Sequence, residues 1–235
     1  MQNYYDFFVL LHPMKIEPIA YFRSPLTSKF GIPRQSGIVH DLRGRIEFVP
    51  AYRQPEALRG LDDYDFLWLI WGFSENVDAA KHPTVRPPLL GGNERMGVWA
   101  TRSPFRPNNL GLSSVRIAQL DTEGPAIEVL GADIMDGTPI YDIKPYLPYV
   151  DSHPEARGGF TDHREWQQLT VQIPETFRRQ FCSSDLQVLR QLLALDPRPH
   201  YHHDDQRQYG LPFMDRDVRF HVANGVLTVD DVIAP

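Results

Sequence analysis

The chain has 235 residues, of which 42% are hydrophobic, so it can form one large domain or one domain with a small addition. Its formal net charge of −6 argues against a protein that coats nucleic acid non-specifically, but not against a local basic patch. No stretch approaches the roughly 18 consecutive apolar residues of a membrane span, so we expect no membrane insertion. One cysteine, Cys182, excludes an internal disulfide, and its helical context predicts a buried, inert thiol in a cytoplasmic protein.

Strand-like patterning begins only after Met14, so residues 1–13 are predicted to be an N-terminal extension that the fold does not need. Its apolar run is too short for a signal peptide and lacks the basic flank that a signal peptide carries. Ile16 to Phe22 suits a first strand, and Gly44 to Val49 suits a second because apolar and charged side chains alternate there. Pro55 to Leu61 predicts one or two helical turns.

The segment Tyr64 to Phe73 is apolar on both faces and predicts a central, buried strand. Two further strands are predicted at Leu112 to Leu120 and at Ala126 to Leu130. Short strands separated by turn signals, with almost no helical period, indicate a β-barrel or a sandwich. We therefore expect the first 170 residues to be mainly β.

The pattern changes near the C-terminus. Leucines recur at helical spacing in Asp185 to Leu195, which predicts a helix. Val218 to Val229 predicts a β-hairpin around Asn224-Gly225, a dipeptide that favours tight hairpin turns. The sequence thus predicts a β-barrel domain over residues 14–170, followed by a small α+β domain over residues 171–235.

Motifs of several enzyme classes are missing. There is no glycine-rich dinucleotide fingerprint, no Walker-type phosphate loop and no nucleophile elbow around a serine. One loop gathers potential metal ligands, namely His200, His202, His203, Asp204 and Asp205. Their spacing matches no standard structural zinc pattern, so we expect a solvated loop and no metal.

The stretch Arg95 to Gly111 combines a stiff backbone with repeated arginines. Its first half, Met96 to Thr101, predicts a short buried strand. In its second half two prolines fix φ and withhold amide donors, while asparagine and glycine tolerate unusual backbone angles. Guanidinium groups prefer planar anions such as carboxylate or phosphate, so a binding site is favoured over a proline-rich turn with solvated arginines.

Four loops stiffened by proline and glycine follow predicted strands and carry polar side chains. These are Arg34 and Gln35; Arg86; Arg95, Arg102 and Arg106; and Asp133, Asp136, Asp142 and Lys144. If the loops converge at one end of a barrel, they form a pocket of mixed charge. Such a pocket suits a ligand with a sulfonium or ammonium group, a carboxylate and a purine. A basic face on an acidic body also suits docking of a structured RNA.

Short motifs occur through the chain in a fixed order. They are Pro33-Arg34-Gln35; Thr84-Val85-Arg86-Pro87-Pro88; Gly91-Gly92-Asn93 with Arg95-Met96-Gly97; Ala100-Thr101-Arg102-Ser103; Phe105-Arg106-Pro107-Asn108; Asp136-Gly137-Thr138-Pro139 with Asp142-Ile143-Lys144-Pro145-Tyr146; and Asp196-Pro197-Arg198-Pro199 with Tyr201. Together they resemble the TrmO family, the tRNA (N6-threonylcarbamoyladenosine-37) N6-methyltransferases, also called TsaA-like proteins. The main resemblance runs from about Ile16 to Tyr149.

This resemblance implies an S-adenosylmethionine-dependent enzyme on a single-sheet β-barrel. It also implies a homodimer with the cofactor near the subunit interface, and the anticodon loop of tRNA, rather than DNA, as partner. The implied cofactor-binding residues are Pro33, Arg34, Gln35, Phe66, Leu67, Arg95, Leu110, Asp133, Ile134, Met135 and Asp136. The residues expected to contact RNA or the substrate carboxylate are Arg86, Arg102, Arg106 and Asn108. Many relatives carry histidine in place of Phe66 and phenylalanine in place of Trp99.

The chemistry of the implied reaction suggests three catalytic candidates. A ureido nitrogen is a poor nucleophile, so a base or a charge-stabilising group helps methyl transfer to it. Asp136 could accept the N6 proton, Lys144 could stabilise the anion, and Tyr146 follows closely. An aspartate followed by Gly-Thr-Pro is equally typical of a turn. The alternative function is a dimeric small-ligand-binding barrel that senses without turnover, a reading that the arginines at 102 and 106 disfavour.

Overall fold

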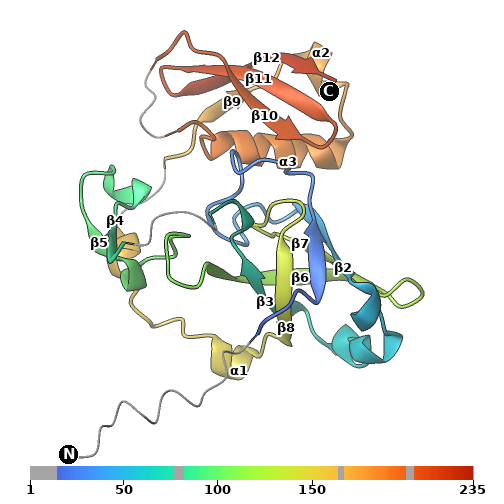
Figure 1. Ribbon diagram of the computed structural model, residues 1–235. Coiled ribbons are helices and arrows are strands. Elements are labelled where there is room, and N and C mark those ends of the chain that lie inside the picture. Colours follow the sequence, from blue (N-terminus) through green and yellow to red (C-terminus); the bar gives the residue numbers. More distant parts are fainter. Residues whose placement is uncertain (1–14, 77–81, 164–166, 200–203, 235) are drawn as a thin grey trace, which may run out of the picture.

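The computed structural model describes residues 15–76, 82–163, 167–199 and 204–234 (Figure 1). The predicted extension over residues 1–13 and the histidines at 200, 202 and 203 lie outside the described residues. Within the described part of the chain, no helix has the length and apolar character needed to cross a membrane.

A closed antiparallel barrel occupies the first part of the chain (Figure 1). Its strands are β1 (Ala20–Arg23), β2 (Arg43–Phe48), β3 (Phe66–Gly72), β6 (Leu110–Asp121), β7 (Ala126–Leu130) and β8 (Pro139–Pro145). They pair in the order β1-β2-β7-β6-β3-β8, with β8 closing onto β1. The interior is filled by alternate apolar side chains, among them Phe22, Ile46, Leu67, Leu69, Ile127 and Ile140. The predicted mainly β, single-sheet barrel is confirmed.

Strand β3 is central, as predicted, because it pairs with β6 on one side and β8 on the other. Its two faces differ, however. Leu67, Leu69 and Trp71 point into the barrel and are buried, whereas Phe66 on the outward face is 41% exposed. The prediction that both faces of this strand are buried was therefore wrong at the Phe66 end. In a closed barrel the inner face is shielded from solvent, whereas the outer face needs another element to cover it.

Short 3-10 turns lie in the connections between barrel strands, and one more such turn and a short α-helix follow the last barrel strand. The 3-10 turns are η1 (Pro50–Tyr52), η2 (Pro55–Leu58), η3 (Leu61–Asp63), η4 (Ser74–Asn76), η5 (Pro88–Leu90), η6 (Val98–Ala100) and η7 (Gly159–His163). The helix is α1 (Pro148–Asp151). The helical turns predicted between residues 55 and 61 correspond to η2 and the start of η3.

The central arginine-rich stretch does not form the predicted buried strand over Met96 to Thr101. Only Met96 and Gly97 form a strand, β5, which pairs with β4 (Thr84–Val85), and the chain then turns through η6. The turn leaves Val98 buried but Trp99 74% exposed. An apolar run alone did not distinguish a strand from a tight turn that buries only one of its side chains.

A second sheet follows near the C-terminus. It contains β10 (Tyr209–Phe213), β11 (Arg216–Ala223), β12 (Val226–Ile233) and β9 (Thr170–Gln172), in the order β10-β11-β12-β9. The hairpin predicted around Asn224-Gly225 is confirmed, since β11 and β12 pair across it and both turn residues have positive φ, 51° and 76°. We call this sheet, with α2 (Glu175–Arg178) and α3 (Ser183–Ala194), the C-terminal unit.

The predicted C-terminal helix is α3, and its apolar side chains Val188, Leu189, Leu192 and Leu193 are buried in the core of the C-terminal unit. Cys182 caps this helix instead of lying inside it. Its Sγ accepts a hydrogen bond from the Asp185 amide at 3.5 Å, and the residue is exposed. The predicted buried thiol was therefore wrong, because the helix begins one residue after the cysteine.

Candidate functional site

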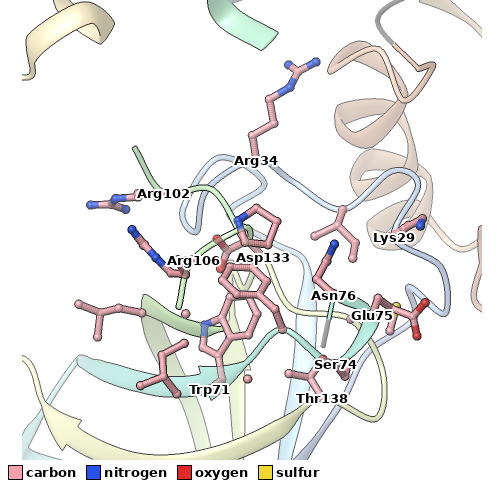
Figure 2. A pocket seen from close by; sticks show the side chains of 18 of the residues that line it. Lys29, Arg34, Trp71, Ser74, Glu75, Asn76, Arg102, Arg106, Asp133 and Thr138 are labelled. Atoms are coloured by element: carbon pink, nitrogen blue, oxygen red, sulfur yellow. The ribbon is translucent and has the colours of Figure 1, made fainter. Parts of the chain in front are cut away.

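A cavity of about 530 Å³, here called the first cavity, lies where five segments converge (Figure 2). It is lined by the loop between β1 and β2, the end of β3 with η4, the segment from Trp99 to Arg106, the start of β6, and the loop between β7 and β8. Three of the four polar loops predicted from the sequence thus contribute, through Arg34 and Gln35, through Arg102 and Arg106, and through Asp133.

A chain of hydrogen bonds connects the barrel wall to the first cavity. The indole Nε1 of Trp71 donates to Ser113 Oγ at 2.9 Å, and Ser113 Oγ donates to Asp133 Oδ1 at 2.5 Å. Ser113 itself is buried. Burial raises the pKa of Asp133 above its ordinary value, although the serine hydrogen bond and the charge of Arg102 oppose this rise. The cavity therefore contains a carboxylate whose charge is poorly solvated and favours a cationic partner.

Two arginines give the first cavity its basic side. Arg102 Nη1 donates to Gln35 Oε1 at 2.6 Å and so links the central stretch to the β1–β2 loop. Arg106 Nη2 donates to the carbonyl oxygens of Val98 and Thr101, at 3.3 and 3.1 Å. Arg106 therefore holds the η6 turn in shape, whereas Arg102 is exposed and bridges two loops. Figure 2 shows both reaching along one flank of the cavity, while Arg34 extends away from it.

The first cavity brings together about half of the residues predicted to bind the cofactor: Pro33, Arg34, Gln35, Leu110, Asp133 and Met135. Leu67 and Ile134 are buried in the barrel core instead. Arg95 is exposed and donates to Thr84 Oγ1 at 2.9 Å, between the short strands β4 and β5. Asp136 accepts a hydrogen bond from the Ser24 amide at 3.0 Å, outside the set of residues that line the cavity.

A second cavity of about 390 Å³ is lined by Ser36, Phe66, Trp68, Arg102, Ser114, Tyr146 and Asp151. The ring centroid of Tyr146 lies 5.6 Å from that of Trp68 and 6.2 Å from that of Phe66. Arg102 lines both cavities. The arrangement thus offers one cavity with a carboxylate and another with aromatic rings, with a shared guanidinium between them.

The structure does not bring the three predicted catalytic residues into one cavity. Tyr146 lines the second cavity, Lys144 pairs with Asp142 at 3.1 Å, and Asp136 is bonded to the backbone of Ser24. Of the residues predicted to contact RNA, Arg102 and Arg106 line the first cavity, whereas Arg86 and Asn108 are exposed and line neither cavity.

Sequence reasoning missed several lining residues of the first cavity. Trp71 and Phe73 were read only as parts of a buried strand, yet both line the cavity, with ring centroids 4.4 Å apart. Ser113 was not considered, although it is a polar residue at an inward position of β6 and connects Trp71 to Asp133. A serine among apolar inward positions is a signal that could have found it. No cluster of three or more metal-ligating side chains occurs among the described residues.

Comparisons with known proteins show which family the chain belongs to. The tRNA-methyltransferase O N-terminal domain matches residues 21–152, and the TrmO C-terminal domain matches residues 166–234. A tRNA (adenine(37)-N6)-methyltransferase of Escherichia coli is 35% identical over 220 residues, which cover 89% of this chain and 94% of that protein. A Pseudomonas aeruginosa protein whose name places it among the S-adenosylmethionine-dependent methyltransferases is 38% identical over 88% of this chain and 91% of its own.

A solved structure of TrmO from Pseudomonas aeruginosa superimposes with a TM-score of 0.79 at 33% sequence identity. The superposition covers 96% of this chain and 99% of that one, so both the barrel and the C-terminal unit are shared. The two family domains match in order and together span most of the sequence. The chain therefore belongs to the TrmO family.

Proposed function

We propose that this protein transfers the methyl group of S-adenosylmethionine to N6 of threonylcarbamoylated adenosine 37 in tRNA. The observation that carries the proposal is the alignment of nearly the whole chain with the E. coli tRNA (adenine(37)-N6)-methyltransferase. The relatives named above are methyltransferases by name, which favours an enzyme over a barrel that only senses a ligand. We further propose a cytoplasmic protein with two domains, the barrel domain and a C-terminal domain that starts with β9.

The first cavity suits S-adenosylmethionine chemically. Its volume of about 530 Å³ lies within the range of ligand pockets of proteins. Asp133 offers a carboxylate to the cationic groups of the cofactor, and Trp71 and Phe73 offer aromatic rings. Gln35 and Leu110 complete the wall on either side. Bound S-adenosylmethionine supplies an electrophilic methyl group on a positively charged sulfur, and the protein's part is to orient it and to favour that charge.

We assign the acceptor side of the reaction to Arg102 and Tyr146. Arg102 is exposed and lines both cavities, so a guanidinium is available to a phosphate or to the threonyl carboxylate. Tyr146 lines the second cavity together with two other aromatic rings, which suits an unstacked base. The hydrogen bond from the Ser24 amide supports a structural role for Asp136. Tyr146 is therefore the better-placed candidate for handling the N6 proton.

The proposed function is tested by incubating the purified protein with S-adenosylmethionine and tRNA from cells that lack the activity. Mass spectrometry of the nucleosides is expected to show a methylated form of threonylcarbamoyladenosine. Tyr146→Phe is expected to keep cofactor binding and lower the single-turnover rate, by roughly 10²-fold or more if the phenol acts as acid or base. A protein that binds the cofactor but methylates no tRNA nucleoside would refute the proposal.

Arg102→Ala is expected to weaken tRNA binding and to reduce the slope of log affinity against log salt by about one unit per lost phosphate contact. Binding assays over a range of salt concentrations measure both effects. Arg59→Ala is the matched control, because Arg59 is also exposed but lies in the turn between η2 and η3. Equal losses in the two variants would show that Arg102 has no specific contact with RNA.

We also propose a homodimer with its interface beside the first cavity. The outward faces of β3 and β6 expose apolar side chains, with Leu112 54% and Phe66 41% exposed. Exposed apolar groups clustered on one face are typical of interaction surfaces. Leu112 also lines the first cavity, which places this surface next to the proposed cofactor site.

Leu112→Glu is therefore expected to shift the protein from dimer to monomer, because a charge would be buried without a partner in the interface. Sedimentation at micromolar concentration measures the change. Ile233→Glu is the control, since Ile233 is 44% exposed at the end of β12 in the C-terminal unit. A wild-type protein that sediments only as a 27.1 kDa monomer would contradict the dimer.

A further inference from the structure

The loop between β1 and β2, residues 24–42, belongs structurally to two parts of the molecule. Its turn Pro33 to Gln35 lines the first cavity beside the barrel. Its apolar side chains Leu26, Val39 and Leu42, in contrast, are buried in the hydrophobic core of the C-terminal unit. The same loop therefore forms a wall of the proposed cofactor site and part of a core built from a distant segment of the sequence.

Backbone contacts fix this loop from two sides. On the side of the C-terminal unit, the amide of Met214 donates to the carbonyl of Pro25 at 2.8 Å. On the side of the barrel, the amide of Gly37 donates to the carbonyl of Gly131 at 2.8 Å. The amide of Asp136 donates to the carbonyl of Leu26 at 2.9 Å. The loop is thus held between the C-terminal unit and the same β7–β8 connection that carries Asp133.

Gly31 shows how closely the loop approaches the C-terminal unit. Its φ is 85°, a conformation that favours glycine, and a Cβ atom there would collide with Cδ1 of Leu211 on β10. The contact lies only two residues before the cavity-lining turn. A displacement of β10 would therefore be transmitted directly to Pro33.

A charged residue just after α3 also acts on this loop. Asp196, just after α3, has φ 54° and accepts hydrogen bonds from Nε and Nη2 of Arg198, at 2.8 and 2.9 Å. Its charge also acts on Arg34, where burial lowers the pKa of the guanidinium and Asp196 opposes that effect. Figure 2 shows Arg34 extending away from the other labelled side chains of the cavity. Arg34 is thus a lining residue of the cavity whose charge interacts with that of a residue beside α3.

From these contacts we propose that the C-terminal unit is the positioning element of the cofactor site, because its core and β10 hold the β1–β2 loop that carries the turn Pro33 to Gln35. The proposal rests on the function proposed above for the first cavity. In this proposal the C-terminal unit contributes to the binding of S-adenosylmethionine rather than to the binding of RNA.

Leu211→Val tests the apolar contact, because it withdraws the methyl group that meets Gly31. Its control is Leu227→Val in the same core, on β12, which pairs with β11 and β9 rather than β10. We expect similar melting temperatures for the two variants, but weaker binding of S-adenosylhomocysteine in calorimetry only for Leu211→Val. The KM of this variant for S-adenosylmethionine should rise by the same factor, with kcat at saturating cofactor and the KM for tRNA unchanged.

Several results would overturn the proposal. They are unchanged cofactor binding in Leu211→Val, equal weakening in Leu227→Val, or a rise confined to the KM for tRNA. If the unmodified protein itself bound neither S-adenosylmethionine nor S-adenosylhomocysteine, the proposed function would fail instead. The binding measurement on the unmodified protein therefore separates the two failures.

Discussion

Asp133→Asn is expected to weaken binding of S-adenosylmethionine by roughly 30- to 150-fold, because a charge-assisted hydrogen bond contributes about 2–3 kcal/mol. Asparagine keeps the shape of the side chain and can still accept the hydrogen bond from Ser113. What it removes is the negative charge that we assign to the cationic groups of the cofactor. Isothermal calorimetry measures the change directly.

Glu75→Gln is the matched control for this variant. Glu75 also lines the first cavity and carries a carboxylate, but it is exposed and well solvated. Its neutralisation should therefore change cofactor affinity by less than about threefold, in line with the small energies of solvated ion pairs. If the two variants lost affinity equally, net charge at the cavity would matter and the particular position of Asp133 would not.

The raised pKa of Asp133 should make the affinity for S-adenosylmethionine depend on pH. Because burial favours the protonated form, the carboxyl gains its proton as the pH falls through this raised value and then cannot pair with a cation. Affinity for S-adenosylmethionine in the unmodified protein should therefore fall as the pH is lowered. The Asp133→Asn protein should lack this component, which a calorimetric pH series would reveal.

The raised pKa of Asp133 also makes the stability of the cofactor-free protein depend on pH. Between the ordinary pKa of 3.8 and the raised folded value, the folded state binds more protons at Asp133 than the unfolded state does. Raising the pH through that window therefore lowers the free energy of unfolding. Asp133→Asn should remove this contribution, and denaturant unfolding at several pH values would measure it.

The sequence predicts those features of the fold that depend on local patterns. Alternation of apolar and polar residues predicted β2 correctly, and the Asn224-Gly225 turn predicted the β11–β12 hairpin. Near Trp99 and Cys182 the local pattern was misleading. A buried strand was expected around Trp99, but this residue lies in the η6 turn and is exposed. Cys182 was expected inside a helix, but it precedes α3 and is exposed.

The candidate site depends on contacts that no local pattern contains. Ser113, Asp133 and Trp71 come from separate elements and meet only because β3 and β6 pair in the barrel and the β7–β8 connection folds back over them. Likewise, the burial of Leu42 in the C-terminal core joins residues more than a hundred positions apart. Family motifs brought Pro33 to Gln35 and Asp133 into one hypothesis, but the role of Trp71 required the fold.

Gly111→Ala adds only one carbon atom, but it is expected to change the shape of the first cavity. Gly111 on β6 pairs with Trp71 on β3, and a Cβ atom there would lie 2.5 Å from Cζ2 of the indole and closer still to Cε2. The indole would have to move, and its hydrogen bond to Ser113 would be strained. Overpacking of this kind destabilises a protein by about 1–3 kcal/mol.

We therefore expect Gly111→Ala to lower the free energy of unfolding by that amount and to weaken cofactor binding at least tenfold, because Trp71 and Asp133 are displaced together. Gly97→Ala is the control, since a Cβ atom there meets no atom within 4 Å and φ is not positive. Adding Trp71→Phe to Gly111→Ala makes room for the methyl group and should restore part of the stability, but not the affinity. Full recovery of both would show that the Trp71–Ser113–Asp133 chain does not shape the site.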